Sequence, residues 1–134
     1  MRLGIIRRYS SSIAGIAHPV VAVGDDDPAF RMLLRLNLEL EGYSVLEAAN
    51  AAEVRGLLDS HEIDLLLLDV RLGDDDGLEL AAEVRSQRPG LPIAFLTGSA
   101  FGLDQQRPEV ADAVLQKPFT LEALSETVAE LTRR

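Results

Sequence analysis

The 134-residue sequence contains no cysteine, which excludes disulfides and metal sites built on thiolates. It also has no apolar run long enough to cross a bilayer, so we expect no membrane partner and a cytoplasmic protein. Basic side chains are scarce: 13 Lys and Arg stand against 22 Asp and Glu, a formal net charge of -9 at pH 7. Such a charge repels phosphate backbones and argues against nucleic acid as a direct partner.

The amino-terminal stretch differs in composition from the rest of the chain. Residues 1–18 contain Arg2, Arg7 and Arg8 and no acidic side chain, whereas residues 19–134 carry 10 basic and 22 acidic ones. The paired arginines interrupt the continuous apolar segment that a targeting peptide needs. We therefore expect a flexible extension over 1–18, followed by one domain over 19–134 that is large enough to bury a sizeable core.

Short apolar runs bounded by turn residues predict five strands, at 19–24, 43–48, 64–69, 91–97 and 113–116, of which the second is half-buried and the first, third and fourth are buried. The third run has four consecutive leucines, which is typical of a central strand covered on both faces. Helical patterns separate the strands, although the stretch 99–110 predicts only a short or degenerate fourth helix. This alternation predicts an α/β fold: a flavodoxin-like, doubly wound, five-stranded parallel sheet in the order 2-1-3-4-5.

Capping residues mark where most of the helices begin. Pro28 suits the first position of the first helix, after Asp27 as its N-cap. Asn50, Asp76 and Thr120 are predicted to cap the later helices. The first helix ends at Gly42, and its spacing predicts an apolar face made of Phe30, Leu33, Leu34 and Leu38.

Polar residues follow the predicted strands at the point where each one ends. Asp25 and Asp26 follow the first strand, Asp69 ends the third, Thr97 ends the fourth and Lys117 follows the fifth. The carboxyl ends of parallel strands share one edge of a sheet, so these side chains should converge. Clustered carboxylates repel one another unless a cation intervenes, and Mg²⁺ prefers such oxygen ligands. Together with a lysine and a hydroxyl, they suit phosphoryl transfer to an Asp side chain.

The sequence resembles the receiver domains of bacterial response regulators over about residues 19–134. The motifs that carry the resemblance are Val23-Gly24-Asp25-Asp26-Asp27-Pro28, Leu68-Asp69-Val70-Arg71-Leu72, Leu96-Thr97-Gly98 and Gln116-Lys117-Pro118-Phe119. Each motif alone is unspecific, but their combination in this order is highly specific.

The resemblance implies a role for each residue of this set. Asp69 would be the phosphoacceptor, and Mg²⁺ would be held by Asp25, Asp26, Asp69 and the backbone carbonyl of Arg71. Thr97 would be the switch hydroxyl that turns toward the phosphoryl group. Lys117 would contact a phosphoryl oxygen, and the peptide bond that joins it to Pro118 would be cis.

The resemblance also implies partners. The phosphoryl group would come from a sensor histidine kinase or a histidine phosphotransfer protein, and the signal would pass to a downstream protein by direct contact. The domain would be a signalling phosphoacceptor rather than an enzyme, with intrinsic Mg²⁺-dependent autophosphorylation and autodephosphorylation.

Three departures from the family pattern stand out. Gly24 replaces an apolar strand residue, Val114 stands where an aromatic partner of the switch threonine is usual, and the segment between Thr97 and Lys117 is short. With Phe95-Leu96-Thr97-Gly98 and Val114-Leu115-Gln116-Lys117-Pro118-Phe119, these features are similar to the single-domain "FAT GUY" receivers. That similarity implies a sensor kinase of the HWE/HisKA2 type.

Three other interpretations stay open. The missing aromatic favours a pseudo-receiver, an interaction module that never accepts phosphate. The chain also fits a receiver cut from a hybrid kinase, although Met1 and the absence of an output domain favour a stand-alone protein. The weakest alternative is a calcium loop through Asp74, Asp76, Gly77 and Glu83, whose first position would be the non-ligating Leu72.

Overall fold

The structure is a computed structural model that describes residues 18–98 and 110–133. The predicted extension 1–18, except for its last residue, and most of the predicted fourth helix lie outside these ranges. The elements in chain order are β1 (Val20–Gly24), α2 (Pro28–Leu40), β2 (Ser44–Ala48), α3 (Ala51–Ser60), β3 (Leu65–Asp69), β4 (Arg71–Leu72), β5 (Asp75–Asp76), α4 (Gly77–Gln87), β6 (Ile93–Thr97), β7 (Ala113–Gln116) and α5 (Leu121–Thr132).

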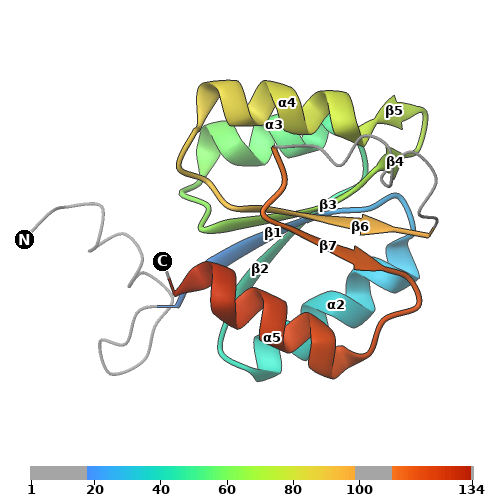
Figure 1. Cartoon of the computed structure of the whole chain (residues 1–134), viewed down its shortest axis with the longest axis vertical. Coiled ribbons are helices and arrows are strands. Elements are labelled where there is room, and N and C mark those ends of the chain that lie inside the picture. The colour runs from blue at the N-terminus through green and yellow to red at the C-terminus, as the bar shows by residue number, and fades with distance from the viewer. Residues whose placement is uncertain (1–17, 99–109, 134) are drawn as a thin grey trace, which may run out of the picture.

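Five strands form a parallel sheet in the order β2-β1-β3-β6-β7, which confirms the predicted order 2-1-3-4-5. Helices cover both faces: α3 and α4 lie on one side of the sheet, and α2 and α5 on the other (Figure 1). The strands therefore run side by side, with all five carboxyl ends at one edge.

This arrangement explains the leucine run of β3, because all five residues of the strand are buried. Leu66 and Leu68 pack into the cluster beneath α3 and α4, while Leu65 and Leu67 pack into the cluster beneath α2 and α5. Successive side chains of a strand point to opposite faces, so a strand covered on both faces needs apolar residues at every position.

The predicted caps are confirmed. The Asp27 carboxylate accepts hydrogen bonds from the N–H groups of Ala29 and Phe30, at 3.0 and 3.2 Å. The side chains of Asn50, Asp76 and Thr120 likewise accept N–H groups in the first turns of α3, α4 and α5. These side chains satisfy donors that have no partner within the helix.

One sequence prediction for α2 is wrong in detail. Leu33 is 49% exposed, so it does not share the buried face of α2 with Leu34 and Leu38. Leu34 and Leu38 lie four residues apart and form one buried stripe along the helix. Leu33 precedes Leu34 by one residue and therefore lies outside that stripe. A small antiparallel hairpin, β4–β5, precedes α4, and Gly73 lies in its turn at φ +66°.

The calcium loop is also wrong. The Glu83 carboxylate is paired with the Arg55 guanidinium through contacts of 2.8 and 3.0 Å on the exposed side of α4. This pairing lowers the pKa of Glu83 through the hydrogen bonds from Arg55. Asp76 caps α4 rather than lining a loop, so neither side chain is arranged to bind calcium.

Two glycines allow close packing around β3. A β-carbon on Gly24 would lie 2.9 Å from Leu68 Cδ1 and 3.1 Å from Val54 Cγ2, which accounts for glycine at this strand position. A β-carbon on Gly77 would lie 2.0 Å from the carbonyl oxygen of Asp69. Gly77 also donates its N–H to the carbonyl of Val70 at 2.9 Å, so α4 begins directly against the end of β3.

This contact predicts that Gly77→Ala destabilises the fold. The added methyl group would meet backbone atoms that cannot move without displacing Asp69, and overpacking of this kind costs about 1–3 kcal/mol. The matched control is Gly56→Ala in α3, where nothing lies within 4 Å. There, alanine should stabilise the helix by roughly 0.5–1 kcal/mol. Urea unfolding measures both changes, and equal stability of Gly77→Ala and the native chain would contradict the prediction.

Candidate functional site

Three carboxylates meet at the carboxyl edge of the sheet, as the sequence predicts. Asp25 and Asp26 follow β1, and Asp69 ends the neighbouring β3, where Gly24 and Leu68 are register partners. One oxygen from each carboxylate lies within 4.8 Å of the other two. Asp25 is 1% exposed and Asp69 is 8% exposed, whereas Asp26 faces solvent.

Lys117, which follows the outer strand β7, completes the cluster at the same edge of the sheet. Its ammonium lies 2.8 Å from Asp25 Oδ2 and 3.0 Å from Asp69 Oδ2. Its backbone N–H donates to the Thr97 carbonyl at 2.6 Å, and the bond that joins it to Pro118 is cis, as the resemblance implied. The lysine therefore connects the ends of β1, β3 and β7.

Lys117 offsets part of the negative charge of this cluster. Burial raises the pKa of Asp25, although the hydrogen bonds from Lys117 and Asp27 act in the opposite direction. Burial disfavours the charged form of Lys117, but its hydrogen bonds to Asp25 and Asp69 outweigh this and raise its pKa. Lys117 thus stays an ammonium group that offsets repulsion between the two carboxylates.

Lys117 also contacts an aromatic ring, which the sequence does not predict. The ammonium lies 4.2 Å from the centroid of the Phe30 ring, and that ring meets Phe119 edge to face at 5.9 Å. A cation over an aromatic face is attracted by the ring quadrupole. The apolar spacing of α2 marks Phe30 only as a core residue and gives no signal for this contact.

The backbone after Asp69 is held by the Asp69 side chain and by the adjacent strand β6. Asp69 Oδ1 accepts the N–H of Arg71 at 2.9 Å, and the N–H of Val70 donates to Leu96 on β6 at 3.1 Å. Because Asp69 and Leu96 are register partners, Thr97 lies one residue beyond Asp69 on the adjacent strand. Thr97 is buried, and Val114 on β7 is half-buried beside the α3–α4 cluster.

The donor set fits a small, hard cation. Three carboxylates stand against one ammonium, so the cluster keeps an excess of negative charge. One of its acids, Asp26, is open to solvent, and the set contains no sulfur or imidazole ligand. Mg²⁺ commonly takes one or two carboxylates and completes its shell with water or phosphate oxygens.

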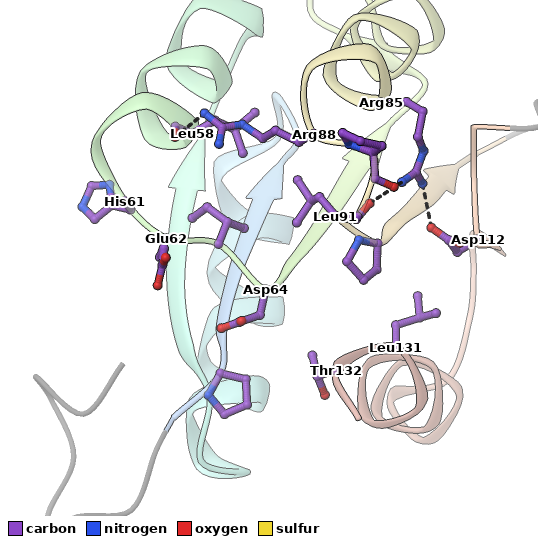
Figure 2. Close-up of a pocket in the computed structure, with 15 residues that line it drawn as sticks. Leu58, His61, Glu62, Asp64, Arg85, Arg88, Leu91, Asp112, Leu131 and Thr132 are labelled. Atoms are coloured by element: carbon purple, nitrogen blue, oxygen red, sulfur yellow. Dashed lines mark hydrogen bonds and ion pairs between the residues drawn. The ribbon is translucent and has the colours of Figure 1, made fainter. Parts of the chain in front are cut away.

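A pocket lies at the opposite, amino-terminal edge of the sheet (Figure 2). Its charged groups hold the strand ends together. Arg85 donates to the carbonyls of Leu91 and Val110 and contacts the Asp112 carboxylate at 2.8 Å. Asp64 accepts the N–H of Val20 at 2.8 Å. We assign these residues a structural role, because their polar atoms are directed at backbone groups.

Among the described residues, no helix is both long enough and apolar enough to span a membrane. The longest of them, α2, has 13 residues.

Comparison with known proteins agrees with the geometry. The family model described as "Response regulator receiver domain" matches residues 21–129. The chain is 36% identical over 106 residues to the transcriptional regulatory protein GlrR of Escherichia coli K12, covering 78% of this chain and 24% of GlrR. It is 39% identical over 120 residues to the response regulator MprA of Mycobacterium avium, covering 85% of this chain and 51% of MprA.

Solved structures show the same fold. A CheY-like response regulator receiver domain protein from Methanospirillum hungatei superposes with a TM-score of 0.81 at 30% identity, covering 87% of this chain and 95% of that one. The response regulator TrrA of Thermotoga maritima, solved in complex with Mg²⁺-BeF, gives 0.78 at 32% identity, covering 85% and 98%. With its five-stranded parallel sheet and its lysine-bridged acidic cluster, the chain belongs to the response regulator receiver domain family.

Proposed function

We propose that this domain accepts a phosphoryl group on Asp69 from a phosphorylated histidine of a partner protein. The observation that carries the proposal is the single ammonium of Lys117 bridging Asp25 and Asp69 at the carboxyl edge of the sheet. Asp69 is partly accessible, ends a strand fixed on both faces, and has a cation in contact with one oxygen. These are the requirements for a carboxylate nucleophile in phosphoryl transfer.

In the transfer, an oxygen of Asp69 forms a bond to phosphorus as the phosphorus–nitrogen bond to the donor imidazole breaks. The bonding electrons leave with the imidazole nitrogen, and the product is an acyl phosphate on Asp69. Lys117 neutralises charge on the phosphoryl oxygens, as it now does on the carboxylate. In hydrolysis, the oxygen of water forms a bond to phosphorus as the bond between phosphorus and the Asp69 oxygen breaks, which returns the free carboxylate and releases inorganic phosphate.

Asp25, Asp26, Asp69 and the backbone carbonyl of Arg71 would hold Mg²⁺. When bound, the ion supplies charge stabilisation for the phosphoryl oxygens. The structure of TrrA in complex with Mg²⁺-BeF supports this assignment by similarity. Asp25 and Asp26 contribute carboxylates whose repulsion the ion would relieve.

Thr97 is proposed as the group that reports phosphorylation. Thr97 lies one residue beyond the register partner of Asp69 on the adjacent strand β6, which supports this role. The usual aromatic partner is replaced by Val114, so the response would pass through a smaller side chain. We infer that the signal reaches a downstream protein through the surface around Thr97, the segment 99–110, Val114 and α5.

The donor is proposed to be a sensor histidine kinase or a histidine phosphotransfer protein, and the "FAT GUY" similarity favours a kinase of the HWE/HisKA2 type. The chain spans a quarter of GlrR and half of MprA, so regulation of transcription is not transferred to it. Its net charge of -9 disfavours direct contact with nucleic acid.

A pseudo-receiver is the second candidate, and the absence of the aromatic at Val114 is the observation that favours it. The presence of Asp69, Lys117 and the acidic pair opposes it. The phosphorylation experiment below distinguishes the two.

Magnesium is expected to stabilise the native chain. A ligand that binds only the folded state adds about 2.7 kcal/mol at 100 times its Kd. Asp26→Asn should lose most of this gain, whereas Asp74→Asn, which removes an exposed acid outside the cluster, should keep it. Urea unfolding with MgCl₂, compared with NaCl at equal ionic strength, measures the effect. A full gain in Asp26→Asn would contradict the proposed ligand set.

Incubation with acetyl phosphate and Mg²⁺ should give an acyl phosphate that hydroxylamine removes. Mass spectrometry should place the added phosphate on Asp69, and Asp69→Asn should not be labelled. Lys117→Gln should be labelled far more slowly, because it removes the cation nearest to the phosphoryl oxygens. A native chain that is folded, binds Mg²⁺ and stays unlabelled would identify it as a pseudo-receiver.

NMR spectra recorded with and without beryllofluoride, in the presence of Mg²⁺, should change around residues 97–116 and along α5. The matched reference region is α3, which lies on the opposite face of the sheet from α5 (Figure 1). Amides of α3 beyond its first turn should change little. Unchanged amides of Thr97 and Val114 at saturation would refute the proposed output surface.

A further inference from the structure

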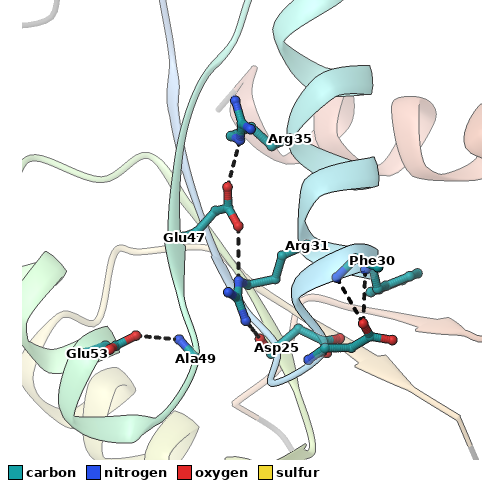
Figure 3. Close-up of polar contacts among 9 residues, drawn as sticks. Asp25, Phe30, Arg31, Arg35, Glu47, Ala49 and Glu53 are labelled. Atoms are coloured by element: carbon teal, nitrogen blue, oxygen red, sulfur yellow. Dashed lines mark hydrogen bonds and ion pairs between the residues drawn. The ribbon is translucent and has the colours of Figure 1, made fainter.

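Every polar atom of Asp25 has a hydrogen-bond partner. Its N–H donates to Ala48 at 3.1 Å, and its carboxylate oxygens accept from the Asp27 N–H at 2.9 Å and from Lys117 Nζ at 2.8 Å. Its carbonyl oxygen accepts a hydrogen bond of 2.6 Å from a guanidinium nitrogen of Arg31 (Figure 3). The peptide unit and the side chain are therefore both fixed.

Arg31 is itself held in place by β2. Its Nε donates to Glu47 Oε1 at 3.0 Å, and the other oxygen of Glu47 accepts Nε of Arg35 at 2.6 Å. Figure 3 shows Glu47 on β2 lying between the two arginines of α2. The Arg31 side chain is 15% exposed and that of Arg35 is 32% exposed. Two arginines thus share one carboxylate, but only Arg31 extends to Asp25 among the contacts described.

Stability alone gives little reason for this arrangement. Partly exposed ion pairs contribute roughly 0–1 kcal/mol each. Arg31 and Arg35 are similar in this respect, since both lie on α2 and both pair with Glu47. What distinguishes Arg31 is a charge-assisted hydrogen bond to the backbone of a residue in the acidic cluster, which is the stronger kind of hydrogen bond.

We propose that Arg31 is a positioning residue for the acidic cluster, which holds the Asp25 peptide so that its carboxylate faces Asp26 and Asp69 in the orientation that Mg²⁺ requires. This inference rests on the proposed function, because it concerns the same ion. Removing a group that orients a metal ligand commonly weakens metal binding about 10–100-fold, because the ligand is no longer held in the orientation that the metal needs.

Simple electrostatics predicts the opposite change in Mg²⁺ affinity when Arg31 is removed. Arg31 is a cation close to the site, so its removal should strengthen the binding of another cation by reducing repulsion. A positioning role predicts weaker binding on removal. The direction of the change therefore separates the two effects, and Arg35 supplies the baseline because it has the same charge and the same carboxylate partner.

The test compares Arg31→Met with Arg35→Met by titrating each 134-residue chain with MgCl₂ in a calorimeter at constant ionic strength. Arg31→Met should bind Mg²⁺ about 10-fold more weakly or worse. Arg35→Met should bind as the native chain does, or slightly more tightly. Arg31→Met that binds as tightly as the native chain, or more tightly, would overturn the positioning role.

A second measurement needs no metal. In metal-free protein, the ¹³C shift of the Asp25 carbonyl reports the hydrogen bond from Arg31, and it should change in Arg31→Met but not in Arg35→Met. If Arg31→Met does not fold, Arg31→Lys keeps the charge but cannot contact Glu47 and Asp25 in the same fork geometry. It should also bind Mg²⁺ more weakly, and native affinity in this variant would overturn the inference.

The outcomes also separate this inference from the proposed function. A native chain that binds no Mg²⁺ overturns both. A native chain that binds Mg²⁺, with an Arg31→Met variant of equal affinity and an unchanged Asp25 carbonyl, overturns only the role of Arg31.

Discussion

The contact of one ammonium with two carboxylates is the interaction on which the site depends. Asp25 and Asp69 are both buried at neighbouring strand ends, and their charges would repel strongly without Lys117. The lysine reaches them from the end of β7, and the Phe30 ring of α2 lies 4.2 Å from its ammonium. The register of the sheet and the position of α2 therefore both affect the electrostatic surroundings of the Lys117 ammonium.

A second constraint fixes the position of Asp69. Both faces of β3 are covered, so the strand cannot shift or rotate without exposing leucines to water. Just beyond it, α4 begins so close to the Asp69 carbonyl that only glycine fits at position 77. The phosphoacceptor proposed here thus stands on a rigid strand, between a packed core and a helix start, with only its side chain near solvent.

Much of this follows from local signals in the sequence. The apolar runs, the caps and the polar strand ends predict the sheet order and bring Asp25, Asp69, Thr97 and Lys117 to one edge. What the sequence does not predict depends on packing between distant segments. Leu33 fits the apolar pattern of α2 as well as Leu34 does, and the contact between Arg31 and Glu47 joins residues that only the docking of α2 on β2 brings together.

The two sides of the site are held differently. On the β1 side, the hydrogen bonds of Asp25 reach β2, α2 and Lys117, so movement there would break several bonds at once. On the β6–β7 side, Thr97 is buried at the end of β6, and Val114 on β7 is half-buried and pairs with Phe95 in the sheet. We place the proposed metal site on the β1 side, where these hydrogen bonds converge, and the proposed signal output on the β6–β7 side, where Thr97 lies.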